Sequence, residues 1–376
     1  MAQTTVRLSS DVVVLKTGHG LMMMTWKPTP VSDGEAFEAI KAGLDSLPSG
    51  VKMLINSGEF YGIDPPTANL ELIARFFEKY PTYTDKVFLS VKGASKIPEV
   101  GIDCSPENLE RSVNRILDKL RGTKKLDLFE CARVDPNYAI EDTIKVLSSF
   151  ITKGKFDYIG LSECRAETVQ RASAIAPISA VEIEVSPWSY TQETIDVIAM
   201  CKGLSICSPL GRGFLTGKIR RPDDFEGALR SRQEEHNDCT IIPCVGRISR
   251  ASCYPSSRNK KRTLENLKGG DIKLSAEDLE ENMKHNFAIV DGLKAIADKK
   301  GITTAQLRIT WVSSLGPHVF PLPGSSKKCT LENLNGGDIE LSSVELREIN
   351  QVLETHTVKG GRYVDEIGDD KLLLRR

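Results

Sequence analysis

The strongest constraint on the fold is a regular alternation of short apolar runs with amphipathic segments along most of the chain. The runs of strand type are VVVLK (12–16), VKMLI (51–55), KVFLSV (86–91), LDLFEC (126–131), FDYIGL (156–161), ISAVEIEV (178–185), LSIC (204–207) and HVFPLPGS (318–325). They are nearly continuous in apolar residues, which indicates strands buried on both faces. Eight strand and helix units predict a single α/β domain, a closed (β/α)8 TIM barrel. An open doubly wound sheet is the alternative, although no Gly-x-Gly-x-x-Gly turn opens a first helix.

The clearest helical pattern is SPENLERSVNRILDKLRG (105–122). Ser105 is the expected N-cap, Pro106 suits the first turn, and Gly122 is the expected stop. Its apolar positions fall on one face, so one side packs and the other is wet. Similar patterns predict helices over 285–301, 303–315 and 342–356.

One stretch breaks the alternation. Residues 228–282 contain no convincing strand or long apolar helix, which predicts a loop or disordered insertion after the seventh strand. Inside it, TLENLKGGDIKLS (263–275) nearly repeats TLENLNGGDIELS (330–342). Only one copy can follow the eighth strand, so the first is an extra segment, arising from a duplication or from an error in the sequence.

Composition limits the class of partner and the compartment. Fifty basic and 51 acidic residues among 376 give a net charge of -1, which argues against nucleic acid. The nine cysteines are odd in number and irregularly spaced, which predicts reduced thiols and a cytoplasmic protein. No run approaches the length of a membrane span, and no metal site is predicted because His236, Cys239 and Cys244 resemble ligands only loosely.

Two polar side chains emerge at strand ends. Tyr61 lies just beyond the apolar run 51–55, and Lys92 lies at the end of the run 87–91. The carboxyl ends of parallel strands are where such folds carry out chemistry. A neighbouring ammonium favours the phenolate and lowers the pKa of a tyrosine, so Tyr61 beside Lys92 is a candidate general acid.

Several separated motifs occur in one order: GHGLMMMTW (18–26), INSGEFYG (55–62), FLSVKG (88–93), LDLFECARVDP (126–136), YIGLSE (158–163), VEIEVSPW (181–188), SPLGRGFLTGK (208–218) and PLPGSSKK (321–328). With these motifs the chain resembles the aldo-keto reductase family, and most of all its fungal and plant pyridoxal reductases. The resemblance implies a (β/α)8 barrel that binds NADPH across its carboxyl-terminal face and reduces a small-molecule carbonyl without a metal.

The same resemblance implies the catalytic roles. Tyr61 matches the proton donor and Lys92 the lysine that assists it. Asn56 stands where most members have an aspartate, and we expect it still to hydrogen-bond Lys92. A histidine that usually contacts the carbonyl is replaced by alanine, which opens space for a pyridine ring. The substrate pocket is expected to be lined by Trp26, Phe60, Ala132 and Trp188.

The cofactor positions carry over from the family less evenly. Ser162 and Glu182 match contacts to the nicotinamide amide, although Glu182 replaces a glutamine. The expected pyrophosphate loop comprises Ser208, Leu210, Gly211 and Arg212. Ser325, Lys327 and Lys328 precede a helix expected to begin near Leu331 and suit the 2′-phosphate of NADPH; Asn333 fits an adenine contact.

The sequence therefore predicts an NADPH-dependent reductase that converts pyridoxal to pyridoxine with Tyr61 as proton donor. A broader aldehyde or ketone reductase is the first alternative. A nucleotide-sensing binding module with little turnover, similar to the potassium-channel subunits of this superfamily, is the second. A chain whose insertion prevents folding is the third, and the oligomeric state is left open.

Overall fold

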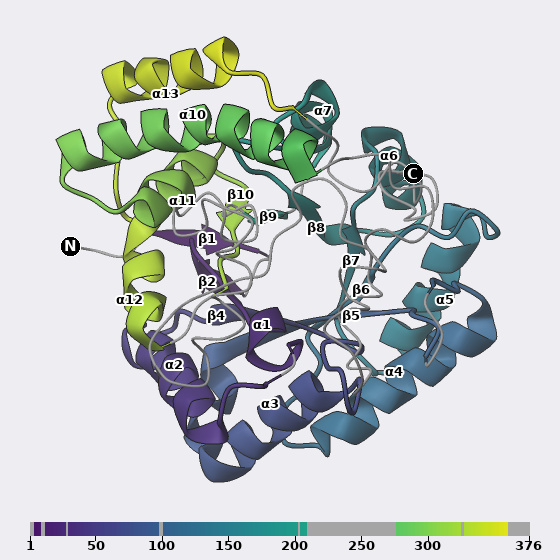
Figure 1. Cartoon of the computed structure of the whole chain (residues 1–376). Coiled ribbons are helices and arrows are strands. Elements are labelled where there is room, and N and C mark those ends of the chain that lie inside the picture. The colour runs from purple at the N-terminus through teal and green to yellow at the C-terminus, as the bar shows by residue number, and fades with distance from the viewer. Residues whose placement is uncertain are drawn as a thin grey trace.

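The computed structural model contains a closed barrel of parallel strands surrounded by helices (Figure 1). It describes residues 4–8, 12–27, 29–97, 101–201, 204–208, 276–324 and 327–359. The eight barrel strands follow chain order, and the first and last meet through a parallel bridge between Gly20 and Gly324. Two backbone hydrogen bonds complete the seam, from Gly18 N to Pro321 O and from Gly20 N to Pro323 O, both 2.9 Å. The closed (β/α)8 barrel is confirmed, and the open sheet is excluded.

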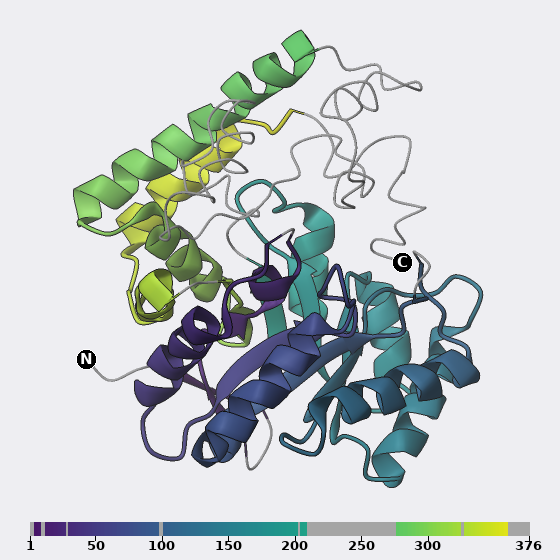
Figure 2. The same ribbon diagram turned by 60° about the horizontal axis from the view of Figure 1, so that its bottom comes forward.

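The barrel strands are β3 (His19–Gly20), β4 (Met53–Gly58), β5 (Val87–Gly93), β6 (Leu128–Cys131), β7 (Tyr158–Ser162), β8 (Ile178–Glu184), β9 (Leu204–Ser208) and β10 (Val319–Pro321). The helices that surround them are α1 (Met22–Thr25), α2 (Asp33–Asp45), α3 (Ala68–Lys79), the 3-10 turn η1 (Pro81–Lys86), α4 (Pro106–Leu120), α5 (Ile140–Thr152), α6 (Ala166–Ser173), α7 (Gln192–Met200), α10 (Ala276–Lys300), α11 (Thr304–Ser314), α12 (Lys327–Gly336) and α13 (Ser343–Thr355). Figure 2 shows α10 and α13 lying side by side, outside the helices that pack on the strands.

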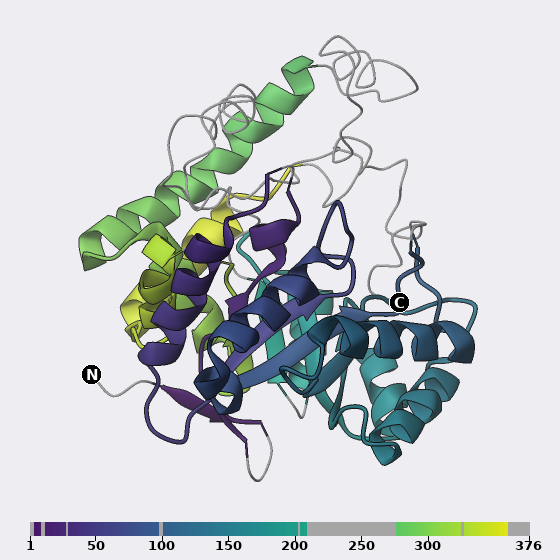
Figure 3. The ribbon, with the colours of Figure 1, turned by 90° about the horizontal axis from the view of Figure 1, so that it is seen from below.

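The first predicted barrel strand is wrong. Residues 12–16 form β2 (Val13–Leu15), which pairs antiparallel with β1 (Thr5–Arg7) in a separate two-stranded sheet. Figure 3 shows this hairpin at one end of the barrel. Val12 and Val14 belong to the same buried cluster as the inward-facing strand residues, so the hairpin closes the amino-terminal end of the barrel. The true first strand, β3, is two residues long and carries no apolar run.

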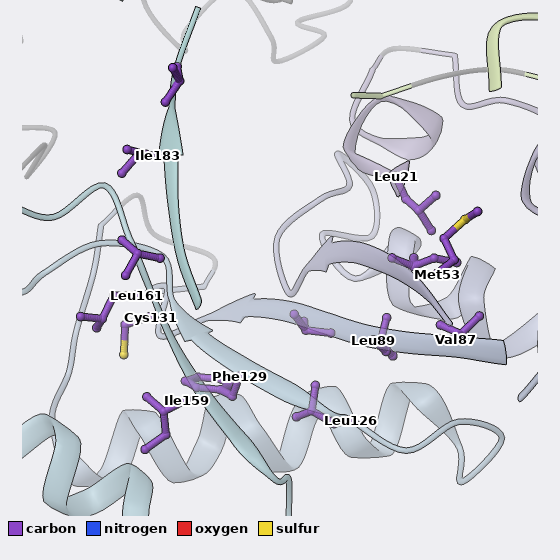
Figure 4. Close-up of a cluster of buried hydrophobic side chains, with 14 of the residues drawn as sticks. Leu21, Met53, Val87, Leu89, Leu126, Phe129, Cys131, Ile159, Leu161 and Ile183 are labelled. Atoms are coloured by element: carbon purple, nitrogen blue, oxygen red, sulfur yellow. The ribbon is translucent and has the colours of Figure 1, made fainter. Parts of the chain in front are cut away.

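Side chains alternate between two environments along each strand, because successive residues point to opposite faces. The outward positions pack against the helices in one large cluster, part of which is drawn in Figure 4. The inward positions near the amino end form a second, apolar cluster that includes Leu54, Phe88, Leu128, Ala180 and Phe320. Two residues further along β4, β5, β6 and β8, the inward positions are polar: Asn56, Ser90, Glu130 and Glu182. The barrel interior is therefore an apolar layer under a polar one.

The helices predicted over residue ranges are confirmed, with ends shifted by one or two residues except in α10, which begins at Ala276 rather than near residue 285. In α4, Ser105 caps the helix by accepting from Asn108 N at 3.2 Å, and Arg121 and Gly122 follow in the left-handed conformation. Thr303 and Gln306 form a capping box that starts α11. The helix expected near Leu331 is α12, which begins four residues earlier, at Lys327.

The predicted insertion lies mostly outside the described residues, including the first copy of the repeat. Its last residues, 276–282, are the start of α10. The cysteine prediction is wrong in one place: Cys104, Cys131, Cys164 and Cys201 are free thiols, but Cys329 takes part in a disulfide bond. Within the described ranges, no cluster of metal-ligating side chains occurs, and no helix is long and apolar enough to cross a membrane.

Candidate active site

The two side chains predicted at strand ends meet inside the barrel. Lys92 belongs to β5, and Tyr61 lies three residues beyond the last residue of β4. The ammonium Nζ of Lys92 donates to the Tyr61 hydroxyl at 3.0 Å. Both residues are buried, with 7% and 4% of their surfaces exposed. A phenol that contacts an ammonium directly can serve as a general acid, because the ammonium stabilises the phenolate left after proton transfer.

A carboxylate from a more distant strand of the barrel pairs with the Lys92 ammonium. Glu182, on β8, is three strands away from β5, yet its Oε1 forms a buried ion pair with Lys92 Nζ. Its Oε2 accepts from Asn56 Nδ2 at 3.0 Å. The expected hydrogen bond between Asn56 and Lys92 is wrong, because Asn56 reaches Lys92 only through Glu182.

Two further members of this cluster, Glu130 and Ser90, were not predicted from the sequence. Glu130, on β6, is fully buried, and its Oε1 accepts from Asn56 Nδ2 at 3.3 Å and from the Ser90 hydroxyl. Gly160 provides the room, since a Cβ there would lie 2.7 Å from Glu130 Cγ. The sequence did contain a clue to Glu130. In the run LDLFEC, Glu130 lies two residues after Leu128, and residues two apart on a strand share a face.

The charges in this cluster shift one another. Burial, and then the neighbouring Glu182, raise the pKa of Glu130 to about 8. Burial alone would lower the pKa of Lys92, but the negative charge of Glu182, the Tyr61 phenol and Glu130 outweigh it and raise that pKa. The ammonium therefore stays charged, and Glu130 holds its proton at neutral pH.

The pKa of Tyr61 moves in the opposite direction from the one predicted. Burial raises it most; Lys92 lowers it, but Glu182 and Glu130 raise it further, so the net shift is upward. The prediction of a lowered pKa is wrong because burial and the two carboxyl groups together outweigh the ammonium. Tyr61 consequently keeps its proton at neutral pH, which a proton donor requires.

Aromatic rings surround the Tyr61 side chain. The Trp26 ring stacks on it with centroids 5.5 Å apart, and Phe60 packs edge-on at 5.2 Å. Trp26 and Phe60 also contact each other and are half-buried. Ala132 is buried just after β6, and Trp188 is half-buried against the hydrophobic core. The Trp26 and Phe60 predictions thus fall beside the candidate acid.

Known proteins share this architecture and these sequence features. The model of the aldo/keto reductase family matches residues 16–354. The chain is a member of the aldo/keto reductase family. It is 35% identical over 352 residues to the probable pyridoxal reductase 2 of Schizosaccharomyces pombe, covering 92% of this chain and 93% of that protein. It is 28% identical to the putative pyridoxal reductase of Saccharomyces cerevisiae, over 95% and 98% of the two chains.

A solved structure supports the fold alone. The glycerol dehydrogenase of Gluconobacter oxydans superposes with a TM-score of 0.67 at 18% sequence identity, over 96% of this chain and 98% of that one. Membership of the family and the barrel together establish the chain as an oxidoreductase of the aldo/keto reductase type.

Two of the cofactor contacts expected from the sequence lie at the carboxyl ends of strands, and three others lie in α12. Ser162 and Ser208 end β7 and β9, and Asn333 is buried in α12. Lys327 and Lys328 open α12, just beyond β10, where a helix N-terminus suits a phosphate. The two carboxylate oxygens of Glu182 instead accept hydrogen bonds from Lys92 and Asn56. The other residues predicted to bind the cofactor, Leu210, Gly211, Arg212 and Ser325, lie outside the described residues.

Gly58 offers a test of how closely Tyr61 is placed. A Cβ on Gly58 would lie 2.8 Å from Tyr61 Cδ1, closer than real contacts allow. We expect Gly58→Ala to displace the ring and lower kcat/KM by about 10- to 100-fold. The measurement is carbonyl reduction together with a thermal melt; Gly34→Ala, where a Cβ meets nothing within 4 Å, is the control. Unchanged kinetics in Gly58→Ala would show that the position of Tyr61 does not limit the rate.

Proposed function

We propose that this aldo/keto reductase reduces a small aldehyde, pyridoxal before others, with NADPH. The observation that carries the proposal is the Tyr61 hydroxyl held by the Lys92 ammonium at 3.0 Å, at the carboxyl end of β5. The names of the yeast relatives, both pyridoxal reductases, support the choice of substrate.

The described residues at the expected cofactor positions support the choice of a phosphorylated dinucleotide. The helix N-terminus at Lys327 and Lys328 would hold a phosphate, and Ser162 would meet the nicotinamide amide. When bound, NADPH supplies the hydride that reduces the carbonyl carbon.

Tyr61 performs the complementary proton transfer. Its Oη donates the proton to the carbonyl oxygen as negative charge develops there, and the Lys92 ammonium stabilises the phenolate that remains. The half-buried rings of Trp26 and Phe60 shield this contact from water, which strengthens the electrostatic effect of Lys92.

The aromatic wall and the small side chain of Ala132 favour a flat, ring-shaped aldehyde. Trp26 and Phe60 offer ring faces and edges beside Tyr61, and Ala132 is a smaller side chain than the histidine that the family usually has at this position. A broader aldehyde and ketone reductase has the same requirements apart from the ring, so it remains the second candidate.

The test is NADPH oxidation with pyridoxal, with aliphatic aldehydes and with ketones, for the wild type and for Tyr61→Phe. We expect pyridoxal to give the highest kcat/KM, and Tyr61→Phe to lower kcat by about 10²- to 10⁴-fold while NADPH binding, followed by cofactor fluorescence, is retained. Tyr83→Phe is the matched control, because the Tyr83 hydroxyl, in η1, donates to Asp45 of α2.

Each outcome of this test favours one of the candidate functions. Higher kcat/KM for aliphatic aldehydes or ketones would replace pyridoxal by the broader reductase. A folded wild type that binds NADPH and turns over none of these carbonyls would reject the enzyme and favour the nucleotide-sensing module. The absence of a cooperative melt would favour a chain that does not fold.

A further inference from the structure

We infer that Glu182 is a positioning residue that holds the Lys92 ammonium against Tyr61, with Asn56 and Glu130 keeping the Glu182 carboxylate in place. The inference rests on the proposed reductase chemistry for its kinetic test only. It assigns to Glu182 a role in the acid machinery rather than in recognition of the cofactor.

The contacts of Lys92 support this role. A lysine ammonium sits on a flexible four-carbon stem and is not fixed by its own geometry. Among the described residues, Lys92 Nζ forms hydrogen bonds with two side chains, those of Tyr61 and Glu182. Glu182 is therefore the anchor, and Tyr61 is the group toward which the ammonium is held.

The contacts of Glu182 show how the anchor is itself held. Asn56 Nδ2 lies between two carboxyl groups, 3.0 Å from Glu182 Oε2 and 3.3 Å from Glu130 Oε1. Glu130 also accepts from the Ser90 hydroxyl. An amide at position 56 thus separates the two carboxyl groups and orients the one that pairs with Lys92.

The groups that face this cluster come from four strands and the segment after β4. They are Asn56 on β4, Tyr61 just after β4, Ser90 and Lys92 on β5, Glu130 on β6 and Glu182 on β8. Glu182 carries negative charge close to Tyr61 and raises the pKa of its phenol. Removing that charge would by itself lower the pKa of Tyr61, but releasing Lys92 removes a larger lowering effect, so the net shift should be upward.

The geometry supplies a rescue variant. Asparagine and aspartate, and glutamate and glutamine, have nearly the same shape, so exchanging acid and amide between positions 56 and 182 keeps the volume and the charge of the cluster. Because Asn56 Nδ2 and Glu182 Oε2 are in hydrogen-bond contact, the exchange also keeps one hydrogen bond with the donor and acceptor reversed.

The experiment compares wild type, Glu182→Gln and the double variant Asn56→Asp/Glu182→Gln. We expect Glu182→Gln to lower kcat/KM by about 10- to 100-fold and to move the Tyr61 titration to higher pH, because Lys92 no longer lies against the phenol. The double variant should recover part of both changes. Glu71→Gln, which breaks the Lys119–Glu71 pair between α3 and α4, should alter neither.

The Tyr61 titration is read without turnover, from the tyrosinate absorbance of each variant minus that of its Tyr61→Phe counterpart. If the wild type reduces no carbonyl, the proposed function fails, but this titration still decides the role of Glu182. A double variant no better than Glu182→Gln, or a Glu182→Gln variant whose Tyr61 titrates at the same pH as in the wild type or at lower pH, would overturn the inference.

Discussion

Replacing Lys92 by methionine is expected to cause both the loss of carbonyl reduction and a large loss of stability. The variant removes the cation next to Tyr61, so kcat should fall by about 10²- to 10⁴-fold. It also leaves the Glu182 carboxylate buried without its cation, and breaking a buried pair in this way costs about 3–5 kcal/mol of the free energy of unfolding. Urea unfolding and steady-state kinetics measure the two effects.

The double variant Lys92→Met/Glu182→Gln separates these effects. It removes the stranded charge together with its partner, so we expect much of the lost unfolding free energy to return while turnover stays low. Equal stability of Lys92→Met and wild type would mean that the Lys92–Glu182 pair is not buried in solution. Recovered turnover in the double variant would mean that Lys92 does not act on Tyr61.

The second large effect concerns the pH dependence of stability. The pKa of Glu130 is about 8 in the folded chain, against an ordinary value of 4.5. Between these two values the folded chain binds a proton that the unfolded chain has released, so the free energy of unfolding falls as pH rises through this window. Glu130→Gln resembles the protonated acid and does not titrate. We expect the wild type to lose stability relative to this variant from about pH 4.5 to about pH 8, by urea unfolding at several pH values.

Glu141 provides the control for this slope. It lies at the surface beside Arg171, which lowers its pKa to about 2, so it is largely ionised in both folded and unfolded chains above about pH 5. Glu141→Gln should therefore change the stability by the same amount at each pH between 5 and 8. Parallel curves for wild type and Glu130→Gln would contradict the raised pKa of Glu130.

The sequence by itself determined the helices and most of the barrel strands. Both depend on neighbours close in the chain: the cap at Ser105 and the capping box at Thr303 start helices, and the apolar run 126–131 contains β6. The carboxyl-terminal location of Tyr61 and Lys92 followed in the same way, because parallel strands end at one edge. These features need no knowledge of which strands become neighbours.

Tertiary structure decided the pairing of charges and the closure of the barrel. The run 12–16 has the composition of a barrel strand, but burial under the barrel favours its pairing with β1 instead. The ion pair between Lys92 and Glu182 joins residues 90 positions apart on strands that are not neighbours, so only a closed barrel brings them together. The pKa of Tyr61 depends on that meeting, since electrostatic shifts are set by distance and burial in space rather than by separation along the chain.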